Sequence, residues 1–394
     1  ILKELMIDMQ KQVKAAVIEG PGKISIQHFP YPDLEQYQGS VLKVTQCGIC
    51  GTDKHSYRGE TRQNSGSDTE FNVAYPYIMG HEAVGILDAV SPGTIRKDFY
   101  GEELHPGDRI TFCPDIVCGE CYYCRTAPWY PWCEDPSREC FGNTMSITRK
   151  PSLFGANAEY MFIPPKAYLY KVPDELPDDL AVLTELMCVT YSLDKAKEMF
   201  AFDGEGFEFG GSVVVLGSGP LGLAHIIKAR MLGAGTIIAT DISDYKLNLA
   251  KEFGADIVLN VRNTTAKERV QMVKEATHGL GANVVCECSG VPSVVPEGLQ
   301  MTRKCGVFLE VGMYVDMGGI PVNMAEVTGK NIRIIGMNNH AATGYRPTME
   351  MMLRHQNNFP WAKFISHKFK LDDYDEAIRI SQTDESMKVV IEAW

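Results

Sequence analysis

The segment that most constrains the fold is residues 211–260, which read GSVVVLGSGPLGLAHIIKARMLGAGTIIATDISDYKLNLAKEFGADIVLN. We expect an apolar strand, a glycine-rich turn, a helix with apolar periodicity and a second strand that ends at Asp241. The turn holds Gly217, Gly219 and Gly222 in the spacing G-x-G-x-x-G, and Asp241 follows nineteen residues after the last glycine. The bare motif is weak evidence, but its place between a strand and a helix predicts a dinucleotide-binding βαβ unit.

The residue types of this turn each have a physical reason. Gly217 permits the tight turn, Gly219 lets a pyrophosphate approach the backbone at the helix N-terminus, and Gly222 allows close packing of helix on strand. Asp241 can accept hydrogen bonds from an adenosine ribose and would repel a 2′-phosphate, so we expect NAD rather than NADP unless Lys246 neutralises the acid. The residues predicted to bind the cofactor are Gly217, Gly219, Pro220, Leu221, Gly222, Asp241 and Lys246.

Three later apolar runs continue the alternation of strands and helices. They read NVVCECSG, GVFLEVGMY and NIRIIGMN, and stretches of helical periodicity separate them. This order of elements predicts an α/β fold with a doubly wound parallel sheet.

A cluster of thiols marks the first half of the chain. Cys118, Cys121, Cys124 and Cys133 follow the spacing C-x2-C-x2-C-x8-C, which lets a short excursion of backbone surround one ion with four thiolates. Twelve cysteines in 394 residues are too sparse for a disulfide scaffold. We therefore favour a closed, structural zinc site over packed or free cysteines, and rank the flanking Cys113 and Cys140 lower as ligands because of their spacing.

Length and charge exclude several classes of protein. The chain is long enough for two domains, and its net charge of −12 argues against a nucleic-acid partner. No apolar run approaches the roughly 18–20 residues needed to cross a bilayer, and the amphipathic start ILKELMIDMQKQVK lacks the features of a cleaved leader. We expect a soluble cytoplasmic protein. A zinc-ribbon interaction module is disfavoured because such modules are short and usually basic when they bind nucleic acid.

Two further motifs supply the donors of a second metal site. Residues 46–55 read QCGICGTDKH and residues 79–82 read MGHE. A lone cysteine is more often a core residue, and a lone histidine is more often simply hydrogen-bonded. Together they offer a thiolate, an imidazole and carboxylates, which is the mixture found in catalytic zinc sites with one open position.

These pieces together resemble the zinc-dependent medium-chain dehydrogenase/reductase family, which includes alcohol, sorbitol and threonine dehydrogenases. The motifs that carry the resemblance are CGICGTDKH, GHEAVG, HPGDRI, the four-cysteine lobe, FGANAEY and VLGSGPLGL. The resemblance implies a GroES-like β-rich catalytic domain over residues 1–188, completed by 342–394, with a structural zinc lobe at about 113–140. A Rossmann NAD-binding domain would span 189–341, and the active site would lie in the cleft between the domains.

The resemblance also assigns ligands to the catalytic zinc. Cys50, which precedes G-T-D, matches the family's thiolate, so Cys47 is expected only to pack. His81 matches the imidazole ligand, and Glu82 the acid beside the metal that joins its coordination in some members. The third protein position falls in VLTELMCV, where Glu185 is the best candidate, either as a ligand or as a residue that holds the metal's water.

The chain departs from the family pattern in several places. Leu186 stands where proline is common, and Cys188 stands where a small hydroxyl residue is usual, so this thiol could compete for the metal. The spacing before Cys133 is one residue longer than usual. Further departures are an insertion at 61–77 and an extended loop at 91–108. The insertion lies between two ligand motifs, near the expected cleft, and could shape substrate choice.

The resemblance implies roles for three residues of the GTDKH segment. Zinc would act as a Lewis acid on an alcohol, and the nicotinamide would accept the hydride. Thr52 would take the alcohol proton and pass it through the cofactor ribose towards His55 and solvent, while Asp53 would orient the His81 imidazole. The alternative is that these residues only form a turn or a helix cap.

The predicted function is therefore a zinc-dependent oxidoreductase that moves a hydride between NAD and a secondary alcohol such as a polyol, sugar or hydroxy acid. The alternatives are a simple aliphatic alcohol dehydrogenase, a zinc-free quinone reductase relative and a nucleotide-binding relative without activity. We expect two zinc ions per chain and a homodimer or homotetramer.

Overall fold

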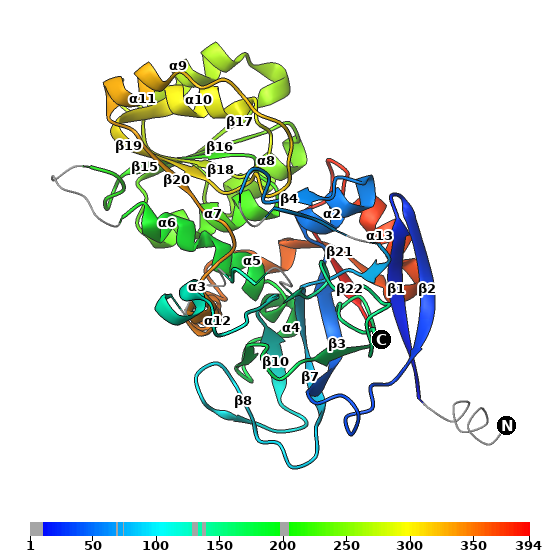
Figure 1. Cartoon of the computed structure of the whole chain (residues 1–394). Helices are drawn as coiled ribbons and strands as arrows, with labels where there is room; N and C mark the ends of the chain where they lie inside the picture. Colours follow the sequence, from blue (N-terminus) through cyan, green and yellow to red (C-terminus); the bar gives the residue numbers. More distant parts are fainter. Residues whose placement is uncertain (1–10, 68–69, 74, 128–132, 136–138, 198–204) are drawn as a thin grey trace, which may run out of the picture.

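Two main β-sheets organise the chain, one in each of two lobes (Figure 1). The structure is a computed structural model that describes residues 11–67, 70–73, 75–127, 133–135, 139–197 and 205–394. Of the helices in these ranges, none is long and apolar enough to cross a membrane.

The upper lobe of Figure 1 contains a sheet of six parallel strands in the order β17-β16-β15-β18-β19-β20. The strands are β15 (Ser212–Leu216), β16 (Thr236–Asp241), β17 (Ile257–Asn260), β18 (Ala282–Glu287), β19 (Thr302–Glu310) and β20 (Arg333–Gly336). The order reverses between β15 and β18, which confirms the predicted doubly wound sheet and locates its switch point.

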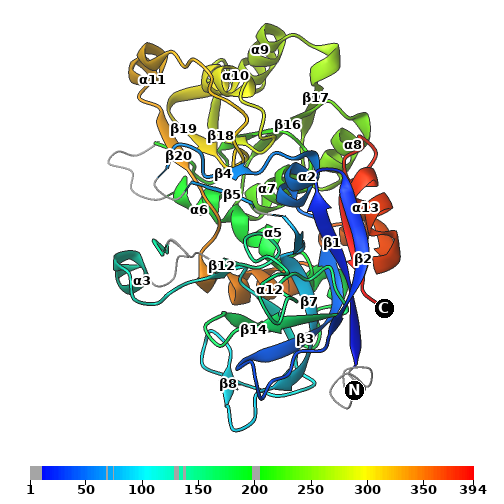
Figure 2. The same cartoon turned by 45° about the vertical axis from the view of Figure 1, so that its right-hand side comes forward.

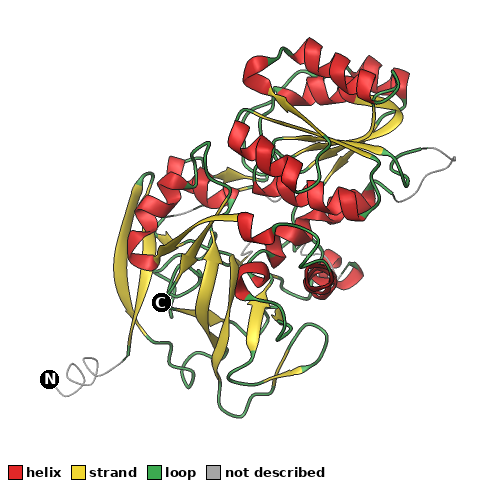
Figure 3. Cartoon of the chain, turned by 180° about the vertical axis from the view of Figure 1, so that it is seen from behind, coloured by secondary structure: helices red, strands yellow, loops and turns green. Residues whose placement is uncertain are grey.

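Alternating residues of the first strand bury both faces of this sheet. Val213 and Val215 face a core that includes Leu223 of α7 (Pro220–Met231) and Leu249 of α8 (Asp244–Glu252). Val214 faces another core, with α9 (Ala266–Ala276) and α10 (Val294–Met301). A strand buried on both sides reads as a continuous apolar run, as SVVVL does. Figure 3 shows the resulting layers, with helices on both sides of the strands.

The lower lobe is built on a mostly antiparallel sheet in the order β14-β10-β7-β3-β22-β21, with β13 also paired to β3. These strands are β3 (Ser40–Gly48), β7 (Glu82–Val90), β10 (Arg109–Phe112), β13 (Tyr160–Ile163), β14 (Leu169–Lys171), β21 (Ile365–Lys370) and β22 (Lys388–Glu392). A smaller sheet contains β1 (Gln12–Gly20), β2 (Lys23–Pro30) and β6 (Tyr77–Ile78). Because β22 pairs with β3, the end of the chain returns to the sheet that its first half began.

Short elements complete the two lobes. Two-residue strands pair in three small antiparallel sheets: β4 (Arg62–Gln63) with β5 (Phe71–Asn72), β8 (Arg96–Lys97) with β9 (Glu103–Leu104), and β11 (Asp115–Ile116) with β12 (Glu139–Cys140). The remaining helices are α2 (Gly51–Arg58), α3 (Tyr122–Thr126), α4 (Asp178–Ala181), α5 (Thr184–Cys188), η1 (Val189–Tyr191), α6 (Ser192–Lys195), η2 (Val261–Asn263), α11 (Met324–Lys330), η3 (Ala342–Gly344), α12 (Tyr345–Arg354), η4 (Trp361–Lys363), η5 (Leu371–Asp373) and α13 (Tyr374–Ile380).

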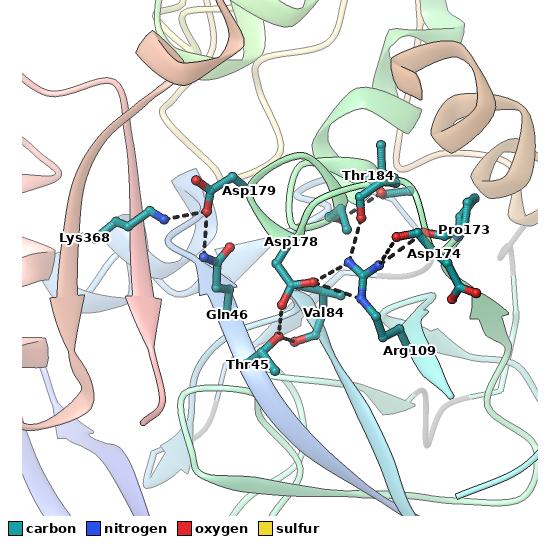
Figure 4. Close-up of polar contacts among 12 residues, drawn as sticks. Thr45, Gln46, Val84, Arg109, Pro173, Asp174, Asp178, Asp179, Thr184 and Lys368 are labelled. Carbon is teal, nitrogen blue, oxygen red and sulfur yellow. Dashed lines mark hydrogen bonds and ion pairs between the residues drawn. The ribbon is translucent and has the colours of Figure 1, made fainter. Parts of the chain in front are cut away.

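Two adjacent carboxylates fix α4 on the lower sheet (Figure 4). Asp178 accepts a hydrogen bond of 2.8 Å from Thr45 Oγ1 of β3 and pairs with Arg109 of β10. Asp179 accepts hydrogen bonds from Gln46 Nε2, at 2.7 Å, and from Lys368 Nζ, at 2.5 Å. These contacts hold the chain where it leaves the lower sheet, directly before α5, which carries Glu185.

Candidate metal and cofactor sites

Three of the predicted metal ligands come together at the lower lobe. One ligand atom each from Cys50, His81 and Glu82 lies within 4.8 Å of the other two. Cys50 is the N-cap of α2, Glu82 is the first residue of β7, and His81 directly precedes that strand. Two segments about thirty residues apart thus meet because β3, which leads into Cys50, pairs with β7 in a register that puts Gly48 opposite Glu82.

Hydrogen bonds fix the Cys50 end of this group. Thr52 Oγ1 donates to Cys50 Sγ at 3.2 Å and lies 3.5 Å from His81 Nε2. Asp53 was predicted to orient His81, but its carboxylate accepts the backbone N–H of Cys50 at 2.8 Å and so closes a capping box. The reason is local: an acid at the third helical position lies directly over the N-cap amide.

The buried polar atoms of this group suit a cation. His81 Nδ1 is buried and has no hydrogen-bond partner among the described residues. Burial alone would lower the pKa of His81, but the negative charges of Cys50, Asp53 and Glu185 outweigh it and raise that pKa well above its usual value. The pocket around His81 therefore carries an excess of negative charge, and its thiolate, imidazole and carboxylate match the donors of zinc.

A buried ion pair holds Glu82. Its Oε2 accepts a hydrogen bond from Lys388 Nζ of β22, and each side chain is 1% exposed. Lys388 Nζ also donates to the carbonyl of Ile49 at 3.1 Å. A Cβ on Gly48 would lie 2.6 Å from Lys388 Cε and 2.7 Å from Glu82 Oε2, so only glycine leaves room for this pair.

Glu185 lies near the group but is not part of it. Its Oε1 is 3.1 Å from Nε2 of His340, which is fully buried and follows β20 in the chain. Burial would raise the pKa of Glu185, but the hydrogen bond from His340 and the charges of His340, His81 and Lys388 lower it below its usual value. The structure thus directs this carboxylate towards His340, and its ligation of the metal stays a prediction.

The other thiols near these motifs are buried and unreactive. Cys47 is fully buried, with Sγ 3.7 Å from the carbonyl of Gly48, and burial raises its pKa well above the usual value. Cys188 Sγ lies 3.5 Å from Thr348 Oγ1, and burial raises its pKa as well. Neither sulfur belongs to the group formed by Cys50, His81 and Glu82.

His55 lies at the rim of the site, on α2. Its Nδ1 is 2.6 Å from Glu60 Oε2, and Arg58 Nη2 lies 3.0 Å from the same ring nitrogen. Burial lowers the pKa of His55, and the Glu60 hydrogen bond opposes this. The side chain is 22% exposed, so it can exchange protons with solvent.

The four clustered cysteines also come together. Ligand atoms of Cys118, Cys121, Cys124 and Cys133 lie within 4.8 Å of one another, and the structure contains no disulfide among the described cysteines. Backbone N–H groups of Glu134 and Cys124 lower the pKa of Cys121 to about 7. Cys113 and Cys140, the lower-ranked alternatives, do not belong to this group.

The glycine-rich turn has the shape predicted for a phosphate site. Gly217 has φ +90°, and a Cβ on Gly222 would lie 1.8 Å from the Gly217 carbonyl. Gly219 is the N-cap of α7, and a Cβ there would meet nothing within 4 Å. Pro220 is the first residue of α7 and Leu221 the second. The turn thus packs tightly on its inner side and is open at the helix N-terminus, where a pyrophosphate would bind.

Asp241 ends β16 and closes this turn. Its two carboxylate oxygens accept the backbone N–H groups of Ser218, at 2.8 Å, and Ser243, at 2.9 Å. Next to it is a pocket of about 340 Å³ whose lining includes Ser243, Arg262 and Asp384. The pKa of Lys54 on α2 is lowered to about 8, first by burial and then by the charges of Lys388 and Lys246. The helix that Cys50 caps therefore lies near enough to α8 of the cofactor lobe for these charges to interact.

Sequence reasoning missed Lys388 and His340. Both lie far along the chain from their partners, and neither sits in a recognisable motif. The sequence held one local indication of the buried pair of Glu82 and Lys388, namely Gly48. A glycine at the end of a central strand indicates that another group approaches the backbone closely.

Comparisons with known proteins agree with this geometry. The alcohol dehydrogenase GroES-like domain matches residues 38–174, and the zinc-binding dehydrogenase domain matches residues 220–354. The chain belongs to the zinc-dependent medium-chain dehydrogenase/reductase family, and it is a dehydrogenase that uses zinc and a nicotinamide cofactor.

Individual relatives cover nearly the whole chain. It is 29% identical over 382 residues to 5-exo-hydroxycamphor dehydrogenase of Pseudomonas putida, covering 96% of this chain and 98% of that protein. It is 29% identical over 377 residues to a sorbitol dehydrogenase of Halalkalibacterium halodurans, covering 94% of this chain and 96% of that protein. Among solved structures, an alcohol dehydrogenase of Thermotoga maritima superposes with a TM-score of 0.83 at 28% identity, covering 97% of this chain and 99% of that one.

Proposed function

We propose that this protein is an NAD-dependent zinc dehydrogenase that oxidises a secondary alcohol, such as a polyol, a sugar or a hydroxy acid. The observation that carries the proposal is the group of Cys50, His81 and Glu82 in a chain that also has a glycine-rich turn open at the N-terminus of α7. Relatives named for sorbitol and for hydroxycamphor both act on secondary alcohols, which supports the substrate class.

We assign the catalytic zinc to Cys50, His81 and either Glu82 or Glu185. The unpartnered His81 Nδ1 and the excess of negative charge support a cation at this place. When bound, the metal supplies Lewis acidity that makes the alcohol proton easier to remove. A second, structural zinc belongs to Cys118, Cys121, Cys124 and Cys133, which gives two ions per chain.

The chain's own groups move the proton. Thr52 Oγ1 lies within 3.5 Å of both Cys50 Sγ and His81 Nε2, where a hydroxyl can accept a proton from the substrate and pass it on. His55 at the exposed rim would then exchange this proton with solvent. When bound, the nicotinamide would accept the hydride from the carbon that carries the substrate's hydroxyl group, which would become a carbonyl carbon.

We propose NAD over NADP because Asp241 keeps a carboxylate beside the turn that would bind the ribose. The backbone N–H groups of Ser218 and Ser243 occupy one acceptor position on each oxygen and leave others for hydroxyl groups. Lys246, the residue that could neutralise Asp241, lies on α8, which begins three residues after Asp241. Replacing Asp241 with Ser should reduce the ratio of catalytic efficiency with NAD to that with NADP; an unchanged ratio contradicts the assignment.

The domain limits proposed are 1–188 with 342–394 for the catalytic domain and 189–341 for the cofactor domain. The membership of the strands in two sheets, 40–171 with 365–392 and 212–336, supports these limits. A homodimer or homotetramer is supported by the edge strand β20, where Ile334 is 47% exposed.

A substrate panel tests the function directly. The purified protein is offered polyols, sugars, sugar acids, inositols and simple aliphatic alcohols with NAD, and reduced-cofactor absorbance is followed. We expect the highest catalytic efficiency with a hydrophilic secondary alcohol. A preference for primary aliphatic alcohols, or no reduction of NAD with any member, contradicts the proposal.

A further inference from the structure

The insertion in the catalytic lobe makes contacts across the cleft. Residues 61–67, here named the clasp, include β4 and lie beside the loop that follows β19 in the cofactor lobe (Figure 2). Gln63 forms an antiparallel bridge with Val315. On either side of it, the N–H of Asp316 donates to the carbonyl of Arg62 at 2.9 Å, and the N–H of Asn64 donates to the carbonyl of Tyr314 at 3.3 Å.

Side chains reinforce this bridge. Arg62 Nη1 lies 2.6 Å from Asp316 Oδ2, and Ser65 Oγ donates to the same oxygen at 3.0 Å. The N–H of Gly318 fixes the other carboxylate oxygen at 3.0 Å. Asp316 therefore binds the side chains of both Arg62 and Ser65, and through it the clasp holds the loop. The hydrogen bond from Gly318, followed by that from Ser65, lowers the pKa of Asp316, so the carboxylate is ionised at neutral pH.

The clasp is also fixed to its own lobe. Gln63 is fully buried and exchanges two hydrogen bonds with Asn143, at 2.8 and 3.2 Å. Arg62 forms a second ion pair, with Glu70 at 2.9 Å, inside the insertion. One side of the clasp is anchored in the catalytic lobe, and the other side binds the cofactor lobe. The clasp therefore connects two lobes, and relative motion is the usual expectation for two domains joined by a limited interface.

The loop that the clasp holds follows the carboxyl end of β19, the strand next to β18. Ligands of doubly wound sheets bind at the carboxyl edge of the strands, near the switch point that here lies between β15 and β18. Gly312 of this loop packs so closely on Glu287, the last residue of β18, that a Cβ would lie 2.3 Å from its Oε2. Displacement of Asp316 would therefore move a loop at the edge of the sheet where we propose that the cofactor binds.

We propose that Arg62 is a positioning residue that keeps this loop closed through Asp316, so that breaking the Arg62–Asp316 pair is a step in cofactor release. The proposal rests on the proposed binding of NAD at the glycine-rich turn. The ion pair is exposed and contributes little alone, but a hydroxyl and two backbone hydrogen bonds accompany it. We expect its loss to speed the dissociation of NADH about three- to tenfold.

The test is a double-mutant cycle on the complete protein. Release of NADH is followed by stopped-flow fluorescence in wild type, Arg62→Gln, Asp316→Asn and the double variant. Both single variants should release NADH faster, and the double variant should be no faster than either single one, because the two side chains act as a pair. Single-turnover hydride transfer should remain unchanged, while raised salt should speed release in the wild type alone.

Two matched variants separate this role from a structural one. Glu70→Gln removes the pair inside the insertion and leaves the Arg62–Asp316 pair, so it should release NADH at the wild-type rate. Arg379→Gln removes a surface pair within α13 and should behave in the same way. The proposal is overturned if Arg62→Gln and Asp316→Asn release NADH at the wild-type rate, or if Glu70→Gln speeds release as much as they do. Absence of any NADH binding by the wild type overturns the cofactor assignment and the clasp together.

Discussion

The Thr52 hydroxyl contacts the Cys50 sulfur and the His81 imidazole, and we propose that it accepts the substrate proton. Thr52→Ala should lower kcat about 100-fold, as is usual when a proton-transfer group is lost. The zinc content should not change because the residue ligates nothing. Thr52→Ser, which keeps the hydroxyl, should retain most activity. If Thr52→Ala kept full kcat, the proton would leave by another route.

A buried histidine outside the site gives a prediction about pH. His225 is fully buried; its Nδ1 lies 2.7 Å from the Leu221 carbonyl and its Nε2 lies 2.7 Å from Ser192 Oγ. Burial lowers its pKa to about 4, and the hydrogen bond to the Leu221 carbonyl opposes this. In the unfolded chain the pKa is about 6.5, so the unfolded state takes up the proton first as the pH falls.

The neutral ring therefore contributes stability that is complete above pH 6.5 and is lost as the pH falls towards 4. The loss amounts to about 3 kcal/mol for a shift of this size. Between pH 7 and pH 4 the melting temperature should fall less steeply with decreasing pH for His225→Gln than for the wild type. Parallel curves would show that the pKa of His225 is the same in the folded and unfolded protein, which contradicts the prediction.

Residues inside compact motifs were predictable, and their distant partners were not. The four clustered cysteines have a local spacing that indicates metal binding, Cys50 and His81 lie in motifs that resemble those of the family, and the structure groups each set. His340 and Lys388 contact Glu185 and Glu82 across 155 and 306 residues of sequence. Such contacts depend on the pairing of whole strands, for which a single sequence has no local pattern.

At the scale of elements, the junction of β15 and α7 separates packing from binding. Gly222→Ala would force a Cβ towards the Gly217 carbonyl at 1.8 Å, so it should lower the melting temperature by several degrees. Gly219→Ala meets nothing within 4 Å and should fold normally, but should weaken NAD binding at least about tenfold by blocking the pyrophosphate. Calorimetry and cofactor titration distinguish the two. Equal effects of both variants on both measurements would contradict these roles.

The order of elements was predictable because strands and helices alternate at regular spacing, and the parallel sheet matches it. The insertion at 61–77 was recognised only as a departure from the family pattern. To predict the bridge between Gln63 and Val315, one would need to know how two segments from different lobes are aligned with each other. Neither segment determines that alignment alone.

At the scale of the whole molecule, the cofactor and metal sites depend on how the two lobes meet. Arg262 pairs with Asp384 at 2.8 Å on the side of the pocket beside Asp241, and the clasp joins the lobes at the loop after β19. The return of β22 to the first sheet places Lys388 beneath Glu82. Chemistry at the metal therefore depends on residues from both ends of the chain.

The central claim is that one metal group performs the reaction and the other stabilises the fold. The most direct test measures zinc content, NAD-linked turnover and the melting temperature of wild type, Cys50→Ser and Cys121→Ser, each purified without chelator. We predict two zinc ions in the wild type, one ion and no turnover at an unchanged melting temperature in Cys50→Ser, and a lowered melting temperature in Cys121→Ser. A Cys50→Ser variant that kept both zinc ions and full turnover would contradict the account.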